Sequence, residues 1–223
     1  MNTVLFDLDG TLVDTICDLG AAAAYTMDTY GLKSGYTHED YKLMVGNGVY
    51  KLMERAFAGR IPEEELPAAL AVFKEYYNAH LLDCSAAYPG IVKLLKHLKA
   101  DGFRLAVVTN KPDDSAKKIV SALFEPGLID CVSGQRPELP AKPAPAQVRY
   151  ALAQLGVNFS DCVFVGDSKT DIETAQNCAV PGIGVLWGFR GKEELIAAGA
   201  DFVADSPKTL EKILKDMKNS IDI

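Results

Sequence analysis

The sequence predicts an α/β fold: a parallel sheet flanked by helices, with a helical-bundle cap domain inserted after the first strand. Two observations support this. Short apolar runs that end in polar residues alternate with longer stretches of helical periodicity, as expected for parallel strands buried on both faces. One long stretch near the N-terminus is helical in pattern and contains no convincing strand. The length of 223 residues suits one domain that carries a smaller inserted one.

Four apolar runs are expected to be strands, at residues 4–6, 104–108, 162–165 and 182–186. Helical spacing of apolar residues predicts helices over 91–98, 142–156 and 170–179, and Gly102 follows the first of these as a C-terminal cap. A lysine-rich helix over 208–218 is expected to present a solvated face. Strands that alternate with helices in this way are typical of a parallel sheet.

The helical stretch comprises segments near residues 17–30, 38–45, 49–58 and 63–82, separated by glycine-containing breaks. We therefore expect a core domain formed by residues 1–14 and 86–223, and a helical cap domain formed by residues 15–85.

The composition is 48% hydrophobic and 24% charged, which is ordinary for a globular protein and excludes wholesale disorder. Lys and Arg number 23 against 30 Asp and Glu, so the formal net charge is −7. Because binding to nucleic acid needs clustered cations, this acidic balance argues against it as a general partner. A small anion can still bind where a metal ion or local dipoles reverse the field.

The five cysteines are scattered, without a CxxC pair: Cys17, Cys84, Cys131, Cys162 and Cys178. We expect them to be free thiols in a reducing compartment. The sequence has neither a secretory leader nor an apolar run of the ~20 residues that a membrane helix needs. It is therefore expected to be cytoplasmic, with no membrane partner.

Polar residues stand just past the ends of the predicted strands: Asp7, Asp9, Thr109 and Asp167. Ligands of open α/β sheets bind outside the carboxyl ends of the strands, so neighbouring strands would bring these side chains into one pocket. Asp7 and Asp9 are two residues apart, and in an extended segment they would face the same ligand. Two close carboxylates repel, and Mg²⁺ with a substrate phosphate would relieve the repulsion. The alternative for this pair is a solvated Asp-Gly turn.

Four motifs resemble those of the haloacid dehalogenase-like hydrolases, in the same order and with matching spacing. They are Asp7-Leu8-Asp9-Gly10-Thr11-Leu12-Val13-Asp14-Thr15, Thr109-Asn110, Lys142-Pro143 and Gly166-Asp167-Ser168-Lys169-Thr170-Asp171. The resemblance covers nearly the whole chain. It implies a Rossmann-like sheet with a helical cap inserted between the first two motifs, in agreement with the pattern found independently above.

The resemblance also implies roles for these residues in hydrolysis of a phosphate ester. Asp7 would be the nucleophile that forms an aspartyl-phosphate, and Asp9 the general acid and base. Thr109 and the Asn110 backbone would bind the phosphoryl group, and Lys142 would neutralise charge. An aspartate at position 9 favours phosphoryl chemistry over dehalogenation.

The same resemblance implies an Mg²⁺ site. Asp7, the Asp9 backbone carbonyl and Asp167 would be its ligands. Asp171 would contact the metal ligands, or the ion through a water molecule, without binding the ion directly. An ordinary aspartate in the first turn of a helix explains this residue almost equally well.

The turn Gly46-Asn47-Gly48 resembles part of the cap of phosphoglycolate phosphatases, where its backbone N–H groups would bind a substrate carboxylate. The alternative is a turn that only connects two helices. We expect a phosphatase acting on a small phosphorylated metabolite, as a monomer or homodimer. A β-phosphoglucomutase-like phosphomutase and a pyrophosphatase remain alternatives within the superfamily, and a non-enzymatic phosphate-binding protein is the least favoured.

Overall fold

A computed structural model describes residues 1–46 and 48–219. The chain forms two compact units, one comprising Met1–Val13 with Ala87–Ile223 and the other Asp14–Ala86. Each expected boundary of the cap, at 15 and at 85, lies one residue inside the boundaries of this second unit. We call the two parts the α/β unit and the helical unit.

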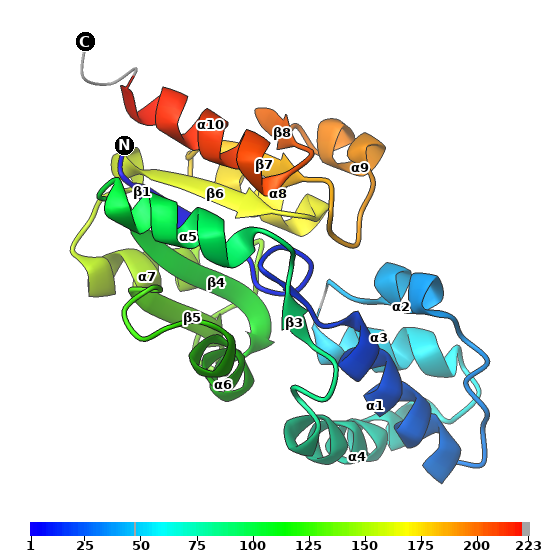
Figure 1. Ribbon diagram of the computed structural model, residues 1–223. Coiled ribbons are helices and arrows are strands. Elements are labelled where there is room, and N and C mark those ends of the chain that lie inside the picture. The colour runs from blue at the N-terminus through cyan, green and yellow to red at the C-terminus, as the bar shows by residue number, and fades with distance from the viewer. Residues whose placement is uncertain (47, 220–223) are drawn as a thin grey trace. The chain divides into compact units, whose positions relative to one another are not determined.

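The α/β unit contains a six-stranded parallel sheet in the order β5-β4-β1-β6-β7-β8 (Figure 1). Its strands are β1 (Thr3–Phe6), β4 (Arg104–Pro112), β5 (Cys131–Gln135), β6 (Cys162–Gly166), β7 (Gly182–Val185) and β8 (Phe202–Ala204). Phe6, the last residue of β1, pairs with Val107 of β4 on one side and Val165 of β6 on the other. The chain segments that follow β1, β4 and β6 therefore leave the sheet at the same edge, the carboxyl ends of the strands.

The described residues of this unit form six α-helices: α5 (Ile91–Ala100), α6 (Asp113–Leu123), α7 (Ala146–Leu155), α8 (Lys169–Asn177), α9 (Lys192–Ala197) and α10 (Pro207–Asn219). Val148 of α7 and Ala175 of α8 join Leu5 and Phe164 of the sheet in one buried cluster. Helices α5 and α10 lie side by side in front of the sheet in Figure 1. The apolar runs predicted as strands are thus buried between helices, and the α/β prediction is confirmed.

Several elements differ from the sequence-based expectation. The helix expected over 142–156 begins only at Ala146, because Pro143 and Pro145 lack a backbone N–H and restrict the residues before them. Strand β4 continues past residue 108 to Pro112. Strands β5 and β8, the two edge strands of the sheet, were not predicted. The apolar run of β5 is interrupted by Ser133, and β8 is a three-residue strand whose first residue, Phe202, is exposed.

The helical unit is built from α1 (Ile16–Thr29), α2 (His38–Met44), α3 (Val49–Phe57), the short 3₁₀ helix η1 (Glu63–Glu65) and α4 (Leu66–Ala79). Thr37 and Asp40 form a capping box that starts α2. Met27, Phe57 and Phe73, one each from α1, α3 and α4, are buried and form part of the unit's own core. No helix within the described ranges is both long and apolar enough to cross a membrane.

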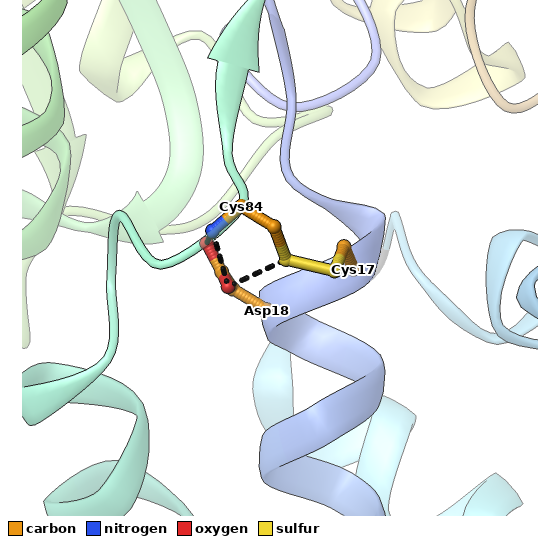
Figure 2. Close-up of side chains that lie close together, drawn as sticks. All are labelled: Cys17, Asp18 and Cys84. Carbon is orange, nitrogen blue, oxygen red and sulfur yellow. Dashed lines mark hydrogen bonds between the residues drawn. A yellow bond between two sulfur atoms is a disulfide. The ribbon is translucent and has the colours of Figure 1, made fainter.

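The prediction that all five cysteines are free thiols is wrong. Cys17, in the first turn of α1, and Cys84 form a disulfide, while Cys131, Cys162 and Cys178 are free (Figure 2). Neither cysteine sits in a recognisable motif, and 67 residues separate them in sequence. They meet because the chain enters the unit through β2 (Val13–Asp14) and leaves it through β3 (Ala86–Ala87), and these two short strands pair with each other.

Candidate active site

Asp7 comes directly after β1, in the middle of the sheet. Its Oδ1 accepts a hydrogen bond of 2.7 Å from the backbone N–H of Leu8 and lies 2.9 Å from the Nζ of Lys142. The central position of β1 places this carboxylate between the ends of β4 and β6. Polar groups from both neighbouring strands can therefore reach it.

Asp167 follows β6 and is buried against the loop after β1. Its Oδ2 accepts a 2.7 Å bond from the backbone N–H of Phe189, and its Oδ1 a 3.3 Å bond from the hydroxyl of Thr11. Gly10 has φ +86°, and a Cβ there would lie 2.4 Å from the Asp167 Oδ2. Glycine is therefore required at position 10 both by the backbone conformation and by the close approach of the loop to the carboxylate.

Lys142 is an almost fully buried lysine that joins two carboxylates. Its Nζ lies 2.9 Å from Asp7 Oδ1 and 2.6 Å from Asp171 Oδ1. The side-chain amide of Asn110 holds the Lys142 backbone from both sides, since Asn110 Nδ2 donates to the Lys142 carbonyl at 3.1 Å and Asn110 Oδ1 accepts from the Lys142 N–H at 2.7 Å. Asn110, expected to act through its backbone, thus has a positioning role through its side chain as well.

Asp171 lies in the first turn of α8 and is fully buried. Its Oδ2 accepts bonds from the Ser168 N–H at 3.1 Å and the Ser168 hydroxyl at 2.7 Å, which completes a capping box. Its Oδ1 faces Lys142. Asp171 therefore caps α8 and also contacts Lys142, and its role around a metal ion stays a prediction.

Carboxylate oxygens of Asp7, Asp167 and Asp171 all lie within 4.8 Å of one another. Burial, and the charges of Asp171 and Asp7, raise the pKa of Asp167 well above its usual range. Burial, with the charges of Asp171 and Asp9, raises the pKa of Asp7 to about 6, even though Lys142 acts in the opposite direction. Three close carboxylates, of which Asp7 and Asp171 are paired with Lys142, leave an excess of buried negative charge, which an oxygen-coordinated divalent cation would compensate.

The neighbouring negative charges favour the charged form of Lys142, whereas they disfavour the charged forms of Asp7 and Asp167. Burial lowers the pKa of its ammonium group, but the negative charges of Asp171 and Asp7 outweigh this and raise it above the ordinary value. Lys142 is therefore a permanent cation in this site, and it cannot serve as a base near neutral pH.

The side chain of Asp9 pairs with a lysine that was not among the candidate residues. Lys111, near the end of β4, is buried, and its Nζ lies 3.0 Å from Asp9 Oδ1 and 3.3 Å from Oδ2. Thr109 is buried two residues earlier, and its Oγ1 accepts a 3.3 Å bond from the Lys111 N–H. The position of Lys111 at the end of an apolar strand could have predicted this pairing, because a buried lysine needs a partner of opposite charge.

The expected substrate-binding turn belongs to the helical unit, between α2 and α3. Gly46 has φ +114° and Gly48, the N-terminal cap of α3, has φ +83°. Asn47 lies outside the described residues. Asp7, Asp9, Thr109, Asn110, Lys142, Asp167 and Asp171 all belong to the α/β unit, so the sequence-predicted site residues divide between the two units.

The parallel sheet and the acidic site at its edge define the class of protein, and the chain belongs to the haloacid dehalogenase-like hydrolase family, whose profile matches residues 4–185. Its relatives include the phosphoglycolate phosphatase of Caulobacter vibrioides, which is 37% identical over 207 residues and aligns with 92% of this chain and 86% of its own length. The phosphoglycolate phosphatase of Colwellia psychrerythraea is 35% identical over 221 residues, 96% of each chain.

A solved structure from Lactobacillus delbrueckii subsp. bulgaricus, described as a candidate phosphoglycolate phosphatase, has a TM-score of 0.90 to this chain. It is 35% identical, and the alignment covers 96% of this chain and 98% of that one. The similarity thus includes the helical insertion as well as the sheet. The resemblance found in the four motifs is confirmed.

Proposed function

We propose that this protein is an Mg²⁺-dependent phosphatase that hydrolyses a small phosphate monoester through an aspartyl-phosphate on Asp7. The observation that carries the proposal is the placement of Asp7 at the end of the central strand, paired with Lys142 and grouped with two further buried carboxylates. The test is phosphate release from p-nitrophenyl phosphate with Mg²⁺ and after treatment with EDTA. Full activity after thorough chelation would overturn the metal requirement.

In the first step Asp7 attacks phosphorus. The Leu8 N–H and Lys142 both bind Oδ1, so we assign the attack to Oδ2, which forms a P–O bond as the ester P–O bond breaks. Lys142 stabilises negative charge on the carboxylate and on the phosphoryl group. Asn110 and Asp171 keep Lys142 in place for this task.

Asp9 gives a proton to the leaving oxygen of the ester in this step. In the second step it takes a proton from the water that attacks the aspartyl-phosphate, so that inorganic phosphate leaves and Asp7 and Asp9 return to their starting states. Lys111 fixes the direction of the Asp9 carboxyl group through its two short contacts. Thr109 would bind the phosphoryl oxygens, with the Asn110 backbone.

The residues assigned to Mg²⁺ are Asp7, Asp167 and the backbone carbonyl of Asp9. When bound, the ion would reduce repulsion between the phosphoryl group and the carboxylates. Asp171 shares the acidic cluster with Asp7 and Asp167, and its two oxygens are engaged by Lys142 and Ser168, which supports an indirect role.

The substrate that we propose is phosphoglycolate or a similarly small phosphorylated acid. The full-length relatives named phosphoglycolate phosphatase support this, as does the resemblance of the Gly46-Asn47-Gly48 sequence to part of the cap of such enzymes. We place the activity in the cytoplasm, where such metabolites occur, and propose that the enzyme works as a monomer or homodimer.

A substrate panel tests this choice. Phosphoglycolate should give the highest kcat/KM among phosphoglycolate, glucose 1-phosphate, glucose 6-phosphate and pyrophosphate. Interconversion of the two glucose phosphates without release of phosphate would favour a phosphomutase, and preferential cleavage of pyrophosphate would favour a pyrophosphatase. Stoichiometric phosphate binding without any turnover would favour a binding protein.

A further inference from the structure

The disulfide between Cys17 and Cys84 lies at the base of the helical unit, where the chain enters and leaves it. The two Cα atoms are 6.1 Å apart, within the range that a disulfide bridges, although 67 residues separate them in sequence. Both cysteines belong to the unit Asp14–Ala86. The bond therefore closes almost the whole helical unit into one covalent loop.

Asp18, next to Cys17, holds the other end of this loop in place (Figure 2). Its buried carboxylate accepts bonds from the Cys84 N–H at 3.1 Å, the Ser85 N–H at 2.9 Å and the Ser85 hydroxyl at 2.5 Å. Asp18 Oδ1 also lies 2.9 Å from the Cys84 Sγ. The three donors above are not sulfur atoms, so their bonds can persist when the disulfide is reduced. Two thiols held side by side in this way have a high effective concentration for each other.

The pair is also accessible, in contrast to other cysteines of the chain. Cys84 is exposed and Cys17 is half-buried. Cys162 and Cys178 are buried, and burial raises the pKa of their thiols to about 12 and about 11, which suppresses the reactive thiolate. An oxidant in solution would therefore select Cys17 and Cys84 over these two thiols.

A metal site is the competing interpretation of the same cluster, since the Cys17 and Cys84 sulfurs and a carboxylate oxygen of Asp18 lie within 4.8 Å of one another. The Asp18 carboxylate, however, is already engaged by the donors of Cys84 and Ser85. A metal ion would have to compete with all three bonds for this ligand. The arrangement favours thiol chemistry.

We propose that Cys17 and Cys84 form a reversible thiol–disulfide site that exchanges with low-molecular-weight thiols and disulfides and that stabilises the helical unit when oxidised. The exposed Cys84 thiolate attacks a small disulfide, RSSR, forming a mixed disulfide and releasing one RS⁻. Cys17, as its thiolate, then attacks the Cys84 sulfur, forming the protein disulfide and releasing the second RS⁻. Two protein thiols lose two electrons and two protons in total, and RSSR becomes two RSH.

Oxidation should raise the thermal stability and leave the chemistry unchanged. Closing a loop of this length restricts the unfolded chain, and the expected rise in Tm is roughly 5–15 °C. The groups that we assign to phosphoryl transfer all belong to the α/β unit. Turnover of p-nitrophenyl phosphate should therefore differ by less than about twofold between the two forms.

The experiment uses the full chain, equilibrated with reduced or with oxidised glutathione and then freed of it. Alkylation under denaturing conditions, read by mass spectrometry, should count five thiols in the reduced protein and three in the oxidised protein. Calorimetry should show the Tm difference in wild type and in the control Cys131→Ser, and no difference in Cys17→Ser/Cys84→Ser. Asp18→Asn, with Ser85→Ala as a milder second variant, should slow oxidation at least several-fold.

Three results would overturn the proposal. One is a count of five thiols after both treatments. Another is a redox-dependent Tm shift of wild-type size in Cys17→Ser/Cys84→Ser. The third is stoichiometric binding of Zn²⁺ by the reduced protein that prevents oxidation and is lost in the double variant, which would assign the cluster to a metal.

Discussion

The two units of the molecule differ in whether they bury pairs of opposite charge. In the helical unit, the pairs Glu39–Lys42 and Lys51–Glu54 each join side chains one helical turn apart on the surface. Exposed pairs of this kind typically contribute less than about 1 kcal/mol to stability. The helical unit therefore owes its stability to the apolar core shared by its helices and to the disulfide at its base.

The α/β unit also has surface pairs, such as Lys96–Glu125, but in addition it buries lysine–carboxylate pairs. Lys142 is paired with Asp7 and Asp171, and Lys111 with Asp9, and the ammonium groups of both lysines are almost completely removed from solvent. Burying charges is costly even when they are paired, and hydrophobic residues would often stabilise the fold as well or better. Their presence at one edge of the sheet indicates a chemical purpose. The contrast fits the proposal that the α/β unit carries the phosphoryl chemistry, while the helical unit contains the glycines that we propose for substrate binding.

The largest expected effect comes from removing the proposed nucleophile. Asp7→Asn should lower kcat by about 10⁴-fold or more, since the remaining groups cannot form the covalent intermediate. The fold should persist, because Lys142 keeps Asp171 as a partner. Phosphate release and circular dichroism measure the two outcomes. A wild-type kcat in protein shown by mass spectrometry to retain asparagine would remove Asp7 from this role.

Asp9→Asn should cost about 10²–10⁴-fold in kcat, as is typical for loss of a positioned general acid and base. The loss should be larger for an alkyl phosphate than for p-nitrophenyl phosphate, because nitrophenolate leaves without needing a proton. An unchanged rate with the alkyl ester would contradict the assignment.

The acidic cluster gives a prediction about pH and stability. Because burial and neighbouring charges raise the pKa of Asp7 from 3.8 to about 6, the folded protein binds more protons than the unfolded chain between these values. The metal-free protein should therefore lose stability as pH rises from about 4 to above 6, on the order of 3 kcal/mol from Asp7.

Mg²⁺ bound to the cluster should reverse this loss, so its effect on Tm should be larger at pH 8 than at pH 5. Asp167→Asn removes one of the three carboxylates and is the matched variant. It should be more stable than wild type at pH 8 without metal, and its response to Mg²⁺ should be weaker. An equal Mg²⁺ shift at both pH values would show that the ion does not bind these groups.

Lys111 contacts Asp9 through both carboxylate oxygens, and we propose that it positions this carboxyl group. Lys111→Met should lower kcat for an alkyl phosphate about tenfold with little change in KM, and the effect on p-nitrophenyl phosphate should be smaller. Lys111→Arg keeps the positive charge and should recover part of the rate. Equal losses on both esters, without recovery in the arginine variant, would point to a purely structural lysine.

The smallest effect is expected in the helical unit. Gly48→Val places a β-branched residue at φ +83°, and should lower kcat/KM for phosphoglycolate about fivefold more than for p-nitrophenyl phosphate. Gly31→Val is the control, since Gly31 has φ +69° and is equally free of neighbours within 4 Å. If both variants behave alike, the turn at Gly48 only connects two helices.

The sequence was informative where local pattern decides the structure. Central strands such as β1 and β6 are apolar on both faces, and the aspartates after them are placed by the strand ends alone. It was uninformative where distant segments meet. The Cys17–Cys84 bond and the pairing of Lys111 with Asp9 join residues far apart in the chain, and no local pattern identifies either partner. The edge strands β5 and β8 were also missed. Each pairs with only one neighbouring strand, so its sequence carries a weaker signal than that of a central strand.

The pairing of β2 with β3 has a consequence for how such a molecule can be assembled from parts. Adjacent strands in a sheet lie about 4.8 Å apart, so the chain departs toward the helical unit and returns from it at almost the same place. The two ends of the inserted segment are therefore as close together as the ends of a tight hairpin loop, regardless of how many residues the segment contains. Because closure entropy grows only slowly with the length of the inserted chain, helical modules of different size could be grafted at this junction without altering the register of β1 and β4.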